Sequence, residues 1–437
     1  MTELFSPRFI STIEANRTIK DELTEAASRQ SARRRISVTD LVNVRQAYFR
    51  RTRPDIVIPL DRRQLMWAGT GFHQLFGAAV SSEEFLEQFL ELDGIVGKVD
   101  IFEDVPVELK TTSFMPQEIG DRGSYFDQLG MYCAMARKGE GQLLVYRRAV
   151  RGQEPMLRAW RIGFSDLPAI EAEMRMRRDL LARALDAEDP SALPRCEWHG
   201  KSCDYREVCG CDEAEPDQRV VPDGTYDVRE DPGLAQAFMA KLRCREPGET
   251  FGIHDLVFPR KSLLERSGAE GGEREQDEPE RSLQSMERSG FQMALLDALY
   301  YGMPGAFKGV PVRLRSLKGV VRTFRGVPTL FRSSRFREIV DRDRLPHAQP
   351  HYFDRLAFDC ALAGQESGRL VLYYENLPGE KFMVYDVRLR NLDAIADEAD
   401  RRLAVLEAGG PPEALPACPQ WMSKFCRFAP ACGCGDE

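Results

Sequence analysis

Three side chains that could carry out metal-assisted hydrolysis lie in one short segment: Asp100, Glu108 and Lys110. The β-prone apolar residues between them predict two strands joined by a turn at Glu103–Asp104. In a strand Glu108 and Lys110 share one face, while Leu109 points to the other. Two carboxylates beside an ammonium group fit a divalent cation, with the lysine holding or polarising the attacking water.

The register of this hairpin decides whether the carboxylates meet. A loop of two residues would place Asp100 opposite Val107 and turn its side chain away from Glu108. A loop of three residues would place Asp100 opposite Glu108. The metal interpretation therefore predicts an odd loop or a bulge. The alternative is a solvated hairpin with scattered charges.

A histidine precedes these strands. We expect a helix to begin at Gly69–Phe76, and His73 lies within that segment. An imidazole suits transition ions such as Mn²⁺, so His73 is a candidate third ligand. The alternative is a structural or exposed histidine.

A helix predicted over residues 125–132 follows the strands. Tyr125, Gln128 and Tyr132 share one of its faces at spacings of three and four. Gln128 and Tyr132 are candidate catalytic residues, and an ordinary amphipathic helix is the alternative. Further strands are expected at 142–146 and 157–162, and a long helix at 167–185.

The composition bounds the possible classes of protein. The chain has 437 residues, 43% of them hydrophobic and 30% charged, which predicts at least two globular domains. No membrane span or apolar signal core is present, so we expect a cytoplasmic protein without membrane association. The net charge of −8 argues against wholesale coating of nucleic acid but allows a local basic groove.

The N-terminal part is the most basic. Residues 1–35 are expected to form a helical basic extension, and Ser37–Asp40 resembles a capping box that opens a helix ending before Pro54. Four arginines of that helix could follow the phosphates of DNA, although a solvated helix face is the alternative. They are Arg45, Arg50, Arg51 and Arg53.

Eight of the eleven cysteines fall into two clusters, Cys196, Cys203, Cys209 and Cys211, and Cys418, Cys426, Cys432 and Cys434. A reducing compartment favours metal binding over disulfides. Zinc and an iron–sulfur cluster both accept four thiolates, so the sequence leaves the metal open.

The second cluster belongs to a repeat. Residues 352–360 echo 125–133, Asp255–Val257 echoes Asp40–Val42, and residues 319–332 align with 97–110 without a gap. The second copy replaces every candidate catalytic group. Its substitutions are Arg322 for Asp100, Leu330 for Glu108, Arg332 for Lys110, Gln292 for His73, Arg355 for Gln128 and Asp359 for Tyr132.

Two segments are expected to lie outside the repeated domains. Residues 212–250 are acidic and rich in Pro and Gly, and they predict a linker between domains at 36–211 and 251–437. Residues 267–282 are charged and Gly-rich, and they predict a disordered insertion in the second copy.

In order along the chain, this pattern resembles the PD-(D/E)XK nuclease superfamily, in particular the RecB-like branch with a cysteine cluster that includes the CRISPR-associated nucleases of spacer acquisition. The resemblance covers about residues 36–211. It is carried by Ser37–Arg53, Gly69 and His73, Gly97 and Asp100, Glu108 and Lys110, Gln128 and Tyr132, and Cys203 and Cys209.

The resemblance implies a restriction-endonuclease-like α/β core, a mixed central sheet flanked by helices, in two tandem copies each closed by a four-cysteine metal site. It implies that His73, Asp100 and Glu108 bind Mg²⁺ or Mn²⁺ and that Lys110 assists the water. Gln128 and Tyr132 would complete the site beside the DNA backbone. The cysteines would hold a [4Fe–4S] cluster. The family usually takes its first cluster cysteine from the helix near Asn43, where this chain has none. Cys211 could replace it, or the group could bind zinc.

The expected function is therefore metal-dependent cleavage of single-stranded DNA or DNA ends, in CRISPR adaptation, DNA repair or phage defence. The degenerate second copy would bind DNA or a partner. An integrase or helicase complex is a possible partner, because the chain has no Walker A motif of its own. The alternatives are a non-catalytic DNA-binding or scaffold subunit and a structural zinc protein.

Overall fold

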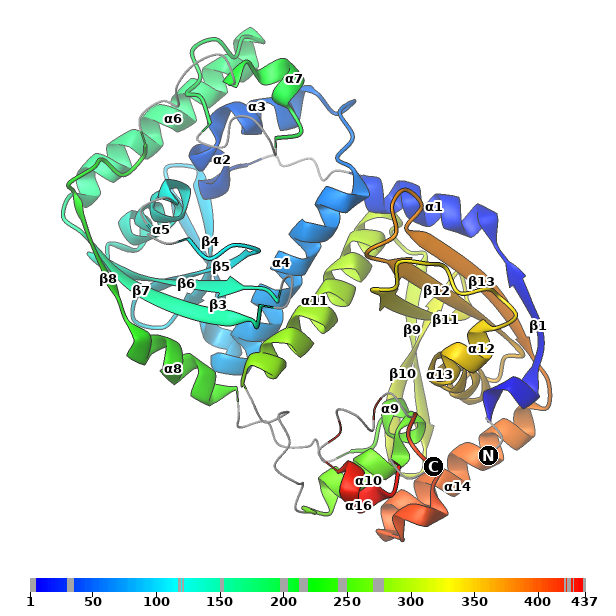
Figure 1. The fold of residues 1–437 in the computed structure, drawn as a ribbon. Coiled ribbons are helices and arrows are strands. Elements are labelled where there is room, and N and C mark those ends of the chain that lie inside the picture. Colours follow the sequence, from blue (N-terminus) through cyan, green and yellow to red (C-terminus); the bar gives the residue numbers. More distant parts are fainter. Residues whose placement is uncertain are drawn as a thin grey trace. The chain divides into compact units, whose positions relative to one another are not determined.

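The structure is a computed structural model of the whole chain. It describes residues 5–29, 35–116, 119, 122–149, 153–196, 203–211, 219–242, 250–269, 279–419, 422, 426 and 428–434. The chain divides into two compact units. The first-copy unit comprises Ser28–Cys244 and Pro279–Phe291, and the second-copy unit comprises Met1–Ala27, Arg245–Glu278 and Gln292–Glu437. Each unit is an α/β fold with a mixed sheet flanked by helices (Figure 1).

The first-copy unit is built on a seven-stranded sheet, in the order β2-β4-β5-β6-β7-β8, with β3 paired to β4. Helices α2, α5 and α6 share one apolar core with the sheet, while α4, α8 and the beginning of α11 share another. The elements are β2 (Ile36–Ser37), α2 (Val38–Val42), α3 (Val44–Thr52), α4 (Leu60–Val80), η2 (Glu83–Phe85), β3 (Leu86–Leu92), β4 (Ile95–Phe102), β5 (Pro106–Thr112), α5 (Gly123–Ala136), β6 (Glu140–Arg147), β7 (Met156–Phe164), α6 (Leu167–Ala187), α7 (Arg206–Cys209), β8 (Tyr226–Glu230) and α8 (Pro232–Lys241).

The second-copy unit has a six-stranded sheet in the order β1-β13-β12-β11-β10-β9. Its core joins this sheet to α9, α10, α13 and α14. The elements are η1 (Ser6–Phe9), β1 (Ile10–Ala15), α1 (Arg17–Ser28), α9 (Ile253–Val257), α10 (Pro259–Arg266), α11 (Pro279–Gly302), β9 (Phe307–Leu314), β10 (Leu317–Phe324), β11 (Val327–Ser334), α12 (Leu345–Ala348), α13 (Pro350–Leu362), β12 (Ser367–Tyr374), β13 (Phe382–Leu389), α14 (Leu392–Ala408), η6 (Pro412–Ala414) and α16 (Ala429–Cys432).

The two sheets share a five-stranded core. Strands β3 to β7 and strands β9 to β13 have the same order and the same pairing directions, with one parallel pair, β5–β6 or β11–β12, at the centre. A buried arginine recurs as well. Arg177 donates to the carbonyl of Leu41, and Arg402 donates to the carbonyl of Leu256.

Each sheet is completed at one edge by a strand from a different stretch of the chain. β8 pairs antiparallel with β7, and β1 pairs antiparallel with β13 (Figure 1). Strand β8 follows the first cysteine cluster, whereas β1 lies at the start of the chain. The prediction of a purely helical extension over 1–35 is therefore wrong for β1. The linker prediction is wrong for residues 219–242, which form β8 and α8.

The two edge strands end in matching contacts. Asn16 donates its backbone N–H to Val384 and caps α1 through Ile19, while Asp231 donates to Ala159 and caps α8 through Leu234. Asn16 also donates to Asp386, and Asp231 accepts from Arg161. Asn16 and Asp231 are separated by the same number of residues as Asp40 and Asp255. Each copy of the repeat thus begins with a strand and a helix, β1 and α1 in the first copy and β8 and α8 in the second. Each of these strands completes the sheet of the other copy.

Helix α4 begins nine residues before Gly69, so the expected start at Gly69 is wrong. The glycine at 71 has a packing role instead, because it lies where α4 meets the first part of α11. A Cβ atom on Gly71 would lie 1.8 Å from the carbonyl oxygen of Gly290. The two glycines permit this close approach of two helices.

Several expectations are confirmed. Ser37 and Asp40 form the predicted capping box, α5 and α6 cover the predicted helices, and β6 and β7 cover the predicted strands. The centre of the predicted insertion, residues 270–278, lies outside the described residues. No helix among the described residues is long and apolar enough to cross a membrane.

The exchange of the edge strands β1 and β8 predicts that a substitution at the end of either strand loosens the sheet of the other copy. Asn16→Ala removes a helix cap worth about 1 kcal/mol and a side-chain bond to β13, so amide hydrogen exchange should accelerate in β12 and β13. Asp231→Ala should accelerate exchange in β6 and β7 instead. Hydrogen–deuterium exchange with mass spectrometry measures both. Each variant serves as the control for the other, and faster exchange in the same copy for both variants would contradict the exchanged topology.

Candidate active site

The hairpin of β4 and β5 has the odd loop that the metal interpretation requires. Ile101 pairs with Val107 and Phe102 with Pro106, which leaves the three residues 103–105 in the loop. Continuing this register places Asp100 opposite Glu108. A two-residue loop would have separated the two side chains.

Asp100 is fixed by two neighbours. One carboxylate oxygen, Oδ2, accepts the backbone N–H of Leu109 at 2.8 Å. The other, Oδ1, lies 3.4 Å from Nδ1 of His73 on α4. The predicted residues Asp100 and His73 therefore meet, although they come from a strand and a helix.

Lys110 links the strand to helix α5. Its ammonium group donates to Oε1 of Glu108 and, at 2.6 Å, to the side-chain oxygen of Gln128. The amide nitrogen of Gln128 contacts the hydroxyl of Tyr132 at 3.2 Å. Lys110 also lies 5.5 Å from the ring centre of Tyr125. All the side chains predicted for the site thus converge from α4, β4, β5 and α5.

Two buried polar atoms at this site lack a hydrogen-bond partner. Nε2 of His73 and Oε2 of Glu108 are buried and have no hydrogen-bond partner within the described part of the chain. Unpaired buried polar atoms are costly and call for an explanation, such as an ion or water. Both atoms belong to the side chains predicted as metal ligands.

The pKa values of the two carboxyl groups are shifted in opposite directions. Burial raises the pKa of Glu108 to about 7, assisted by the charge of Asp100 and opposed by Lys110. Burial also acts on Asp100, but His73, the Leu109 amide and Lys110 outweigh it and hold its pKa below the ordinary value. Burial raises the pKa of Tyr132, which keeps its hydroxyl protonated at neutral pH. Asp100 and Glu108 together can therefore carry either one or two negative charges near pH 7.

The side chains of the candidate site are not arranged around a metal ion. Among the residues that the structure describes, no group of three or more His, Cys, Asp and Glu side chains is arranged to hold a metal ion. The donor types and the two unsatisfied atoms suit a divalent ion, and binding one requires the side chains to turn toward it.

Cysteines of each cluster lie near one another, although the described cysteines form no group that is arranged to hold a metal ion. Cys211 interacts with Cys196, Cys203 and Cys209, and the hydrogen bond from Cys196 lowers the pKa of Cys211 to about 5. Cys434 interacts in the same way with Cys418 and Cys432, and Cys418 lowers its pKa to about 5. None of the ten described cysteines forms a disulfide.

Arg45 and its counterpart Arg260 anchor these cysteine segments. Arg45 is buried and donates to the carbonyls of Cys209 at 2.8 Å and Leu193 at 3.0 Å. Arg260 donates to the carbonyls of Cys432 and Leu415, both at 2.8 Å. Arg45 therefore does not belong to the DNA-binding surface expected from the sequence.

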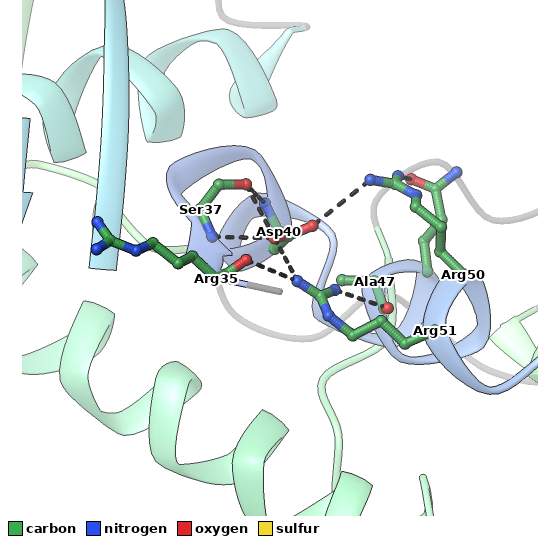
Figure 2. Close-up of polar contacts among 7 residues, drawn as sticks. Arg35, Ser37, Asp40, Ala47, Arg50 and Arg51 are labelled. Carbon is green, nitrogen blue, oxygen red and sulfur yellow. Dashed lines mark hydrogen bonds and ion pairs between the residues drawn. The ribbon is translucent and has the colours of Figure 1, made fainter. Parts of the chain in front are cut away.

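The other three arginines of that expectation also have partners. Arg51 lies 2.8 Å and Arg50 3.5 Å from the carboxylate of Asp40, which is fully buried (Figure 2). Arg51 also donates to the carbonyls of Ala47 and Arg35 (Figure 2). Arg53 pairs with the exposed Asp55. The contacts of Arg50 and Arg51 with Asp40 hold α3 to α2, so these two arginines form a structural brace. Arg53 lies beyond the end of α3 and is exposed, and its contact with DNA stays a prediction.

Sequence reasoning missed this brace, although the repeat contained its signal. Asp40, Arg45 and Arg51 recur at equivalent positions as Asp255, Arg260 and Arg266. Arg266 pairs with Asp255 at 3.4 Å. Polar residues that recur in both copies mark the shared scaffold, whereas those that differ mark the site.

Comparisons with known proteins add little. No family model matches the chain. No curated protein matches it either. Among solved structures it is similar to one described as the crystal structure of SSO0001, at 15% identity and a TM-score of 0.29 over 45% of this chain and 95% of the other. Such a similarity carries no argument about fold or function.

The Asp40 brace predicts a pH-dependent stability. Burial opposes ionisation of Asp40, but Arg51 and Ser37 outweigh it and lower its pKa below the ordinary 3.8. Its stabilisation is therefore full above about pH 4 and is lost as the pH falls through the folded pKa. Asp40→Asn should cost about 3 kcal/mol at pH 7, measured by urea unfolding, and the difference from wild type should narrow below pH 4. Asp227→Asn, at an exposed position, is the control. A cost that is independent of pH would contradict the charge-based explanation.

Proposed function

We propose that the protein is a divalent-metal-dependent deoxyribonuclease with a restriction-endonuclease-like core in each copy. Its substrate is single-stranded DNA or DNA with free ends. The observation that carries the proposal is the odd hairpin register, which brings Asp100 opposite Glu108 beside Lys110, together with the unsatisfied His73 and Glu108 atoms. A site of this kind acts on phosphodiesters through electrostatic stabilisation.

Each residue of the proposed site would have a separate role. Asp100, Glu108 and His73 would hold Mg²⁺ or Mn²⁺, and the bound ion would offset the charge that develops on the phosphate and lower the pKa of a water. Glu108 and Gln128 fix the Lys110 ammonium from two sides, so it can orient the attacking water without free rotation. Gln128 is itself held against Tyr132. This chain of contacts ties the water-orienting group to helix α5.

Cleavage of end-labelled single- and double-stranded DNA in Mn²⁺ tests the proposal. Asp100→Ala and Lys110→Ala should each reduce the rate by at least about 100-fold. Lys98→Ala and Asp104→Ala, which change exposed residues on the same hairpin, are matched controls and should cut like wild type. The labelled end that survives gives the polarity of degradation. DNA binding without cleavage by the wild type would instead favour a non-catalytic scaffold subunit.

We also propose that each four-cysteine cluster binds one metal centre, either a [4Fe–4S] cluster or Zn²⁺. The gathered thiols and the arginine that anchors each cysteine segment support this proposal. The metal would cross-link the cysteine segments, which also pack into the apolar core of each copy.

Metal analysis of anaerobically purified protein tests the clusters. Cys203→Ser and Cys426→Ser should each remove about half of the bound iron or zinc, and the double variant should remove nearly all of it. A brown protein that absorbs near the blue end of the spectrum identifies iron–sulfur, and a colourless protein with zinc identifies the alternative. Cys133→Ala, a buried cysteine outside both clusters, is the control. Unchanged metal content in both serine variants would contradict the proposal.

A further inference from the structure

A phenylalanine follows the central strand of each copy and lies on the surface. Phe114 comes two residues after the end of β5, and Phe336 comes two residues after the end of β11. The repeat alignment continues through these positions without a gap, so Phe114 and Phe336 are counterparts. Their side chains are 68% and 50% exposed. A ring that stays in water gains little from the hydrophobic effect, so stability does not explain its presence in both copies.

The same kind of turn carries both phenylalanines. In the first copy the hydroxyl of Thr112 accepts the backbone N–H of Phe114 at 3.1 Å and donates to the carbonyl of Phe114 at 2.9 Å. In the second copy the hydroxyl of Ser334 accepts the backbone N–H of Phe336 at 3.3 Å. Serine and threonine favour such turns, in which the side chain bonds to the backbone two residues later. The backbone of each phenylalanine is therefore held in place by the strand before it.

Each turn lies at the carboxyl end of the parallel strand pair. Directly after β6, the N–H of Arg148 donates to the carbonyl of Thr112 at 2.9 Å. Directly after β12, the N–H of Glu375 donates to the carbonyl of Ser334 at 2.8 Å. In open α/β sheets, ligands bind beyond the carboxyl ends of the strands. The two phenylalanines are therefore placed where a ligand of this kind of fold is expected.

Phe114 also lies near the candidate active site of the first copy. It is four residues from Lys110, and four extended residues span at most about 14 Å. The next residue, Met115, packs against the apolar core of the same unit. The chain is thus anchored on both sides of Phe114, and a strand bound at the candidate active site can reach its ring.

Arginines lie beside both phenylalanines. In the first copy the guanidinium of Arg148 donates to the hydroxyl of Ser113, the residue before the phenylalanine, at 2.7 Å. In the second copy the residues on either side of the phenylalanine in sequence are Arg335 and Arg337, both exposed. Arg335 also pairs with Glu375 at 3.2 Å. Exposed aromatic rings beside positive charge are the combination by which proteins bind single-stranded nucleic acid.

We propose that Phe114 and Phe336 are stacking platforms, each for one base of a single-stranded nucleic acid. Every base has a flat face, so stacking holds a strand without reading its sequence. In the first copy Phe114 would hold the strand beside the candidate active site, and this part of the proposal rests on the proposed function. In the second copy, which lacks the candidate catalytic groups, Phe336 would hold a strand without cutting it.

Binding of a labelled single-stranded oligonucleotide to the full chain tests this proposal. Fluorescence anisotropy in EDTA, at several KCl concentrations, separates binding from cleavage. The double variant Phe114→Ala with Phe336→Ala should weaken binding at least about 5-fold, whether the two copies hold one strand or two. The slope of log K against log salt should not change, because neither substitution removes a charge. The single variants then assign the loss of affinity, or of one bound strand, to each copy.

Two further substitutions separate stacking from a general apolar contact. Phe114→Trp and Phe336→Trp keep a flat ring and should bind at least as tightly as wild type. Phe114→Leu and Phe336→Leu keep an apolar side chain without a ring and should bind as weakly as the alanine variants. Wild-type affinity in both leucine variants would indicate a surface for an apolar protein partner and would overturn base stacking.

The matched controls are exposed aromatic residues elsewhere in the same two units. Phe89 on β3 is 59% exposed, and Tyr301 on α11 is 63% exposed. Phe89→Ala and Tyr301→Ala should bind like wild type. Thermal unfolding should give the wild-type midpoint for Phe114→Ala and Phe336→Ala, because both rings are exposed. A lower midpoint together with unchanged affinity would assign the rings to structure and overturn the proposal.

The remaining outcomes distinguish this proposal from the nuclease proposal. Weaker binding by the alanine variants of a protein that does not cleave would support the stacking platforms while the nuclease proposal fails. Cleavage by the wild type, with unchanged affinity and unchanged number of bound strands in the double alanine variant, would reject the platforms and leave the nuclease proposal intact. A single alanine variant that binds like wild type in both respects would reject the platform in that copy.

Discussion

The backbone hydrogen bonds at the outer edges of the two sheets constrain how this chain can fold. Without β8, strand β7 would expose a row of unpaired N–H and C=O groups, and β13 would do the same without β1. Each edge is covered by a strand that precedes the other copy in the sequence. The chain must therefore place its first strand on a sheet whose central strands follow some three hundred residues later. Loop-closure entropy makes so distant a pairing slow to form, yet it grows only slowly with chain length.

One scaffold carries two different hairpins because the scaffold and the candidate site depend on different residues. The buried ion pair of Asp40 with Arg51, the anchoring arginines at 45 and 260 and the central parallel strand pair are independent of the hairpin register. The hairpin itself changes by one loop residue between the copies. That change, with the replacement of two carboxylates, removes the oxygen ligands and places Arg322 on the face of the sheet opposite to Leu330.

Burial and pairing explain why the conspicuous arginines of the N-terminal part are structural. Arg45, Arg50 and Arg51 stand in a basic run, which resembles a DNA-binding stripe. In the fold their donors satisfy carbonyls and the carboxylate of Asp40. A charged group is available to a ligand only when the protein leaves it without a full set of partners.

The sequence alone determined the residue types of the candidate site, its helices and strands, and the existence of a repeat. These follow from local periodicity, capping residues and comparison of the chain with itself. The tertiary structure decided three further points: the odd register that places Asp100 opposite Glu108, the exchange of β1 and β8, and the structural pairing of Arg45, Arg50 and Arg51. Each depends on contacts between residues far apart in the chain, and the physical reason is that register, edge pairing and side-chain burial are set by competition among distant partners. Local sequence can allow such contacts but cannot choose between them.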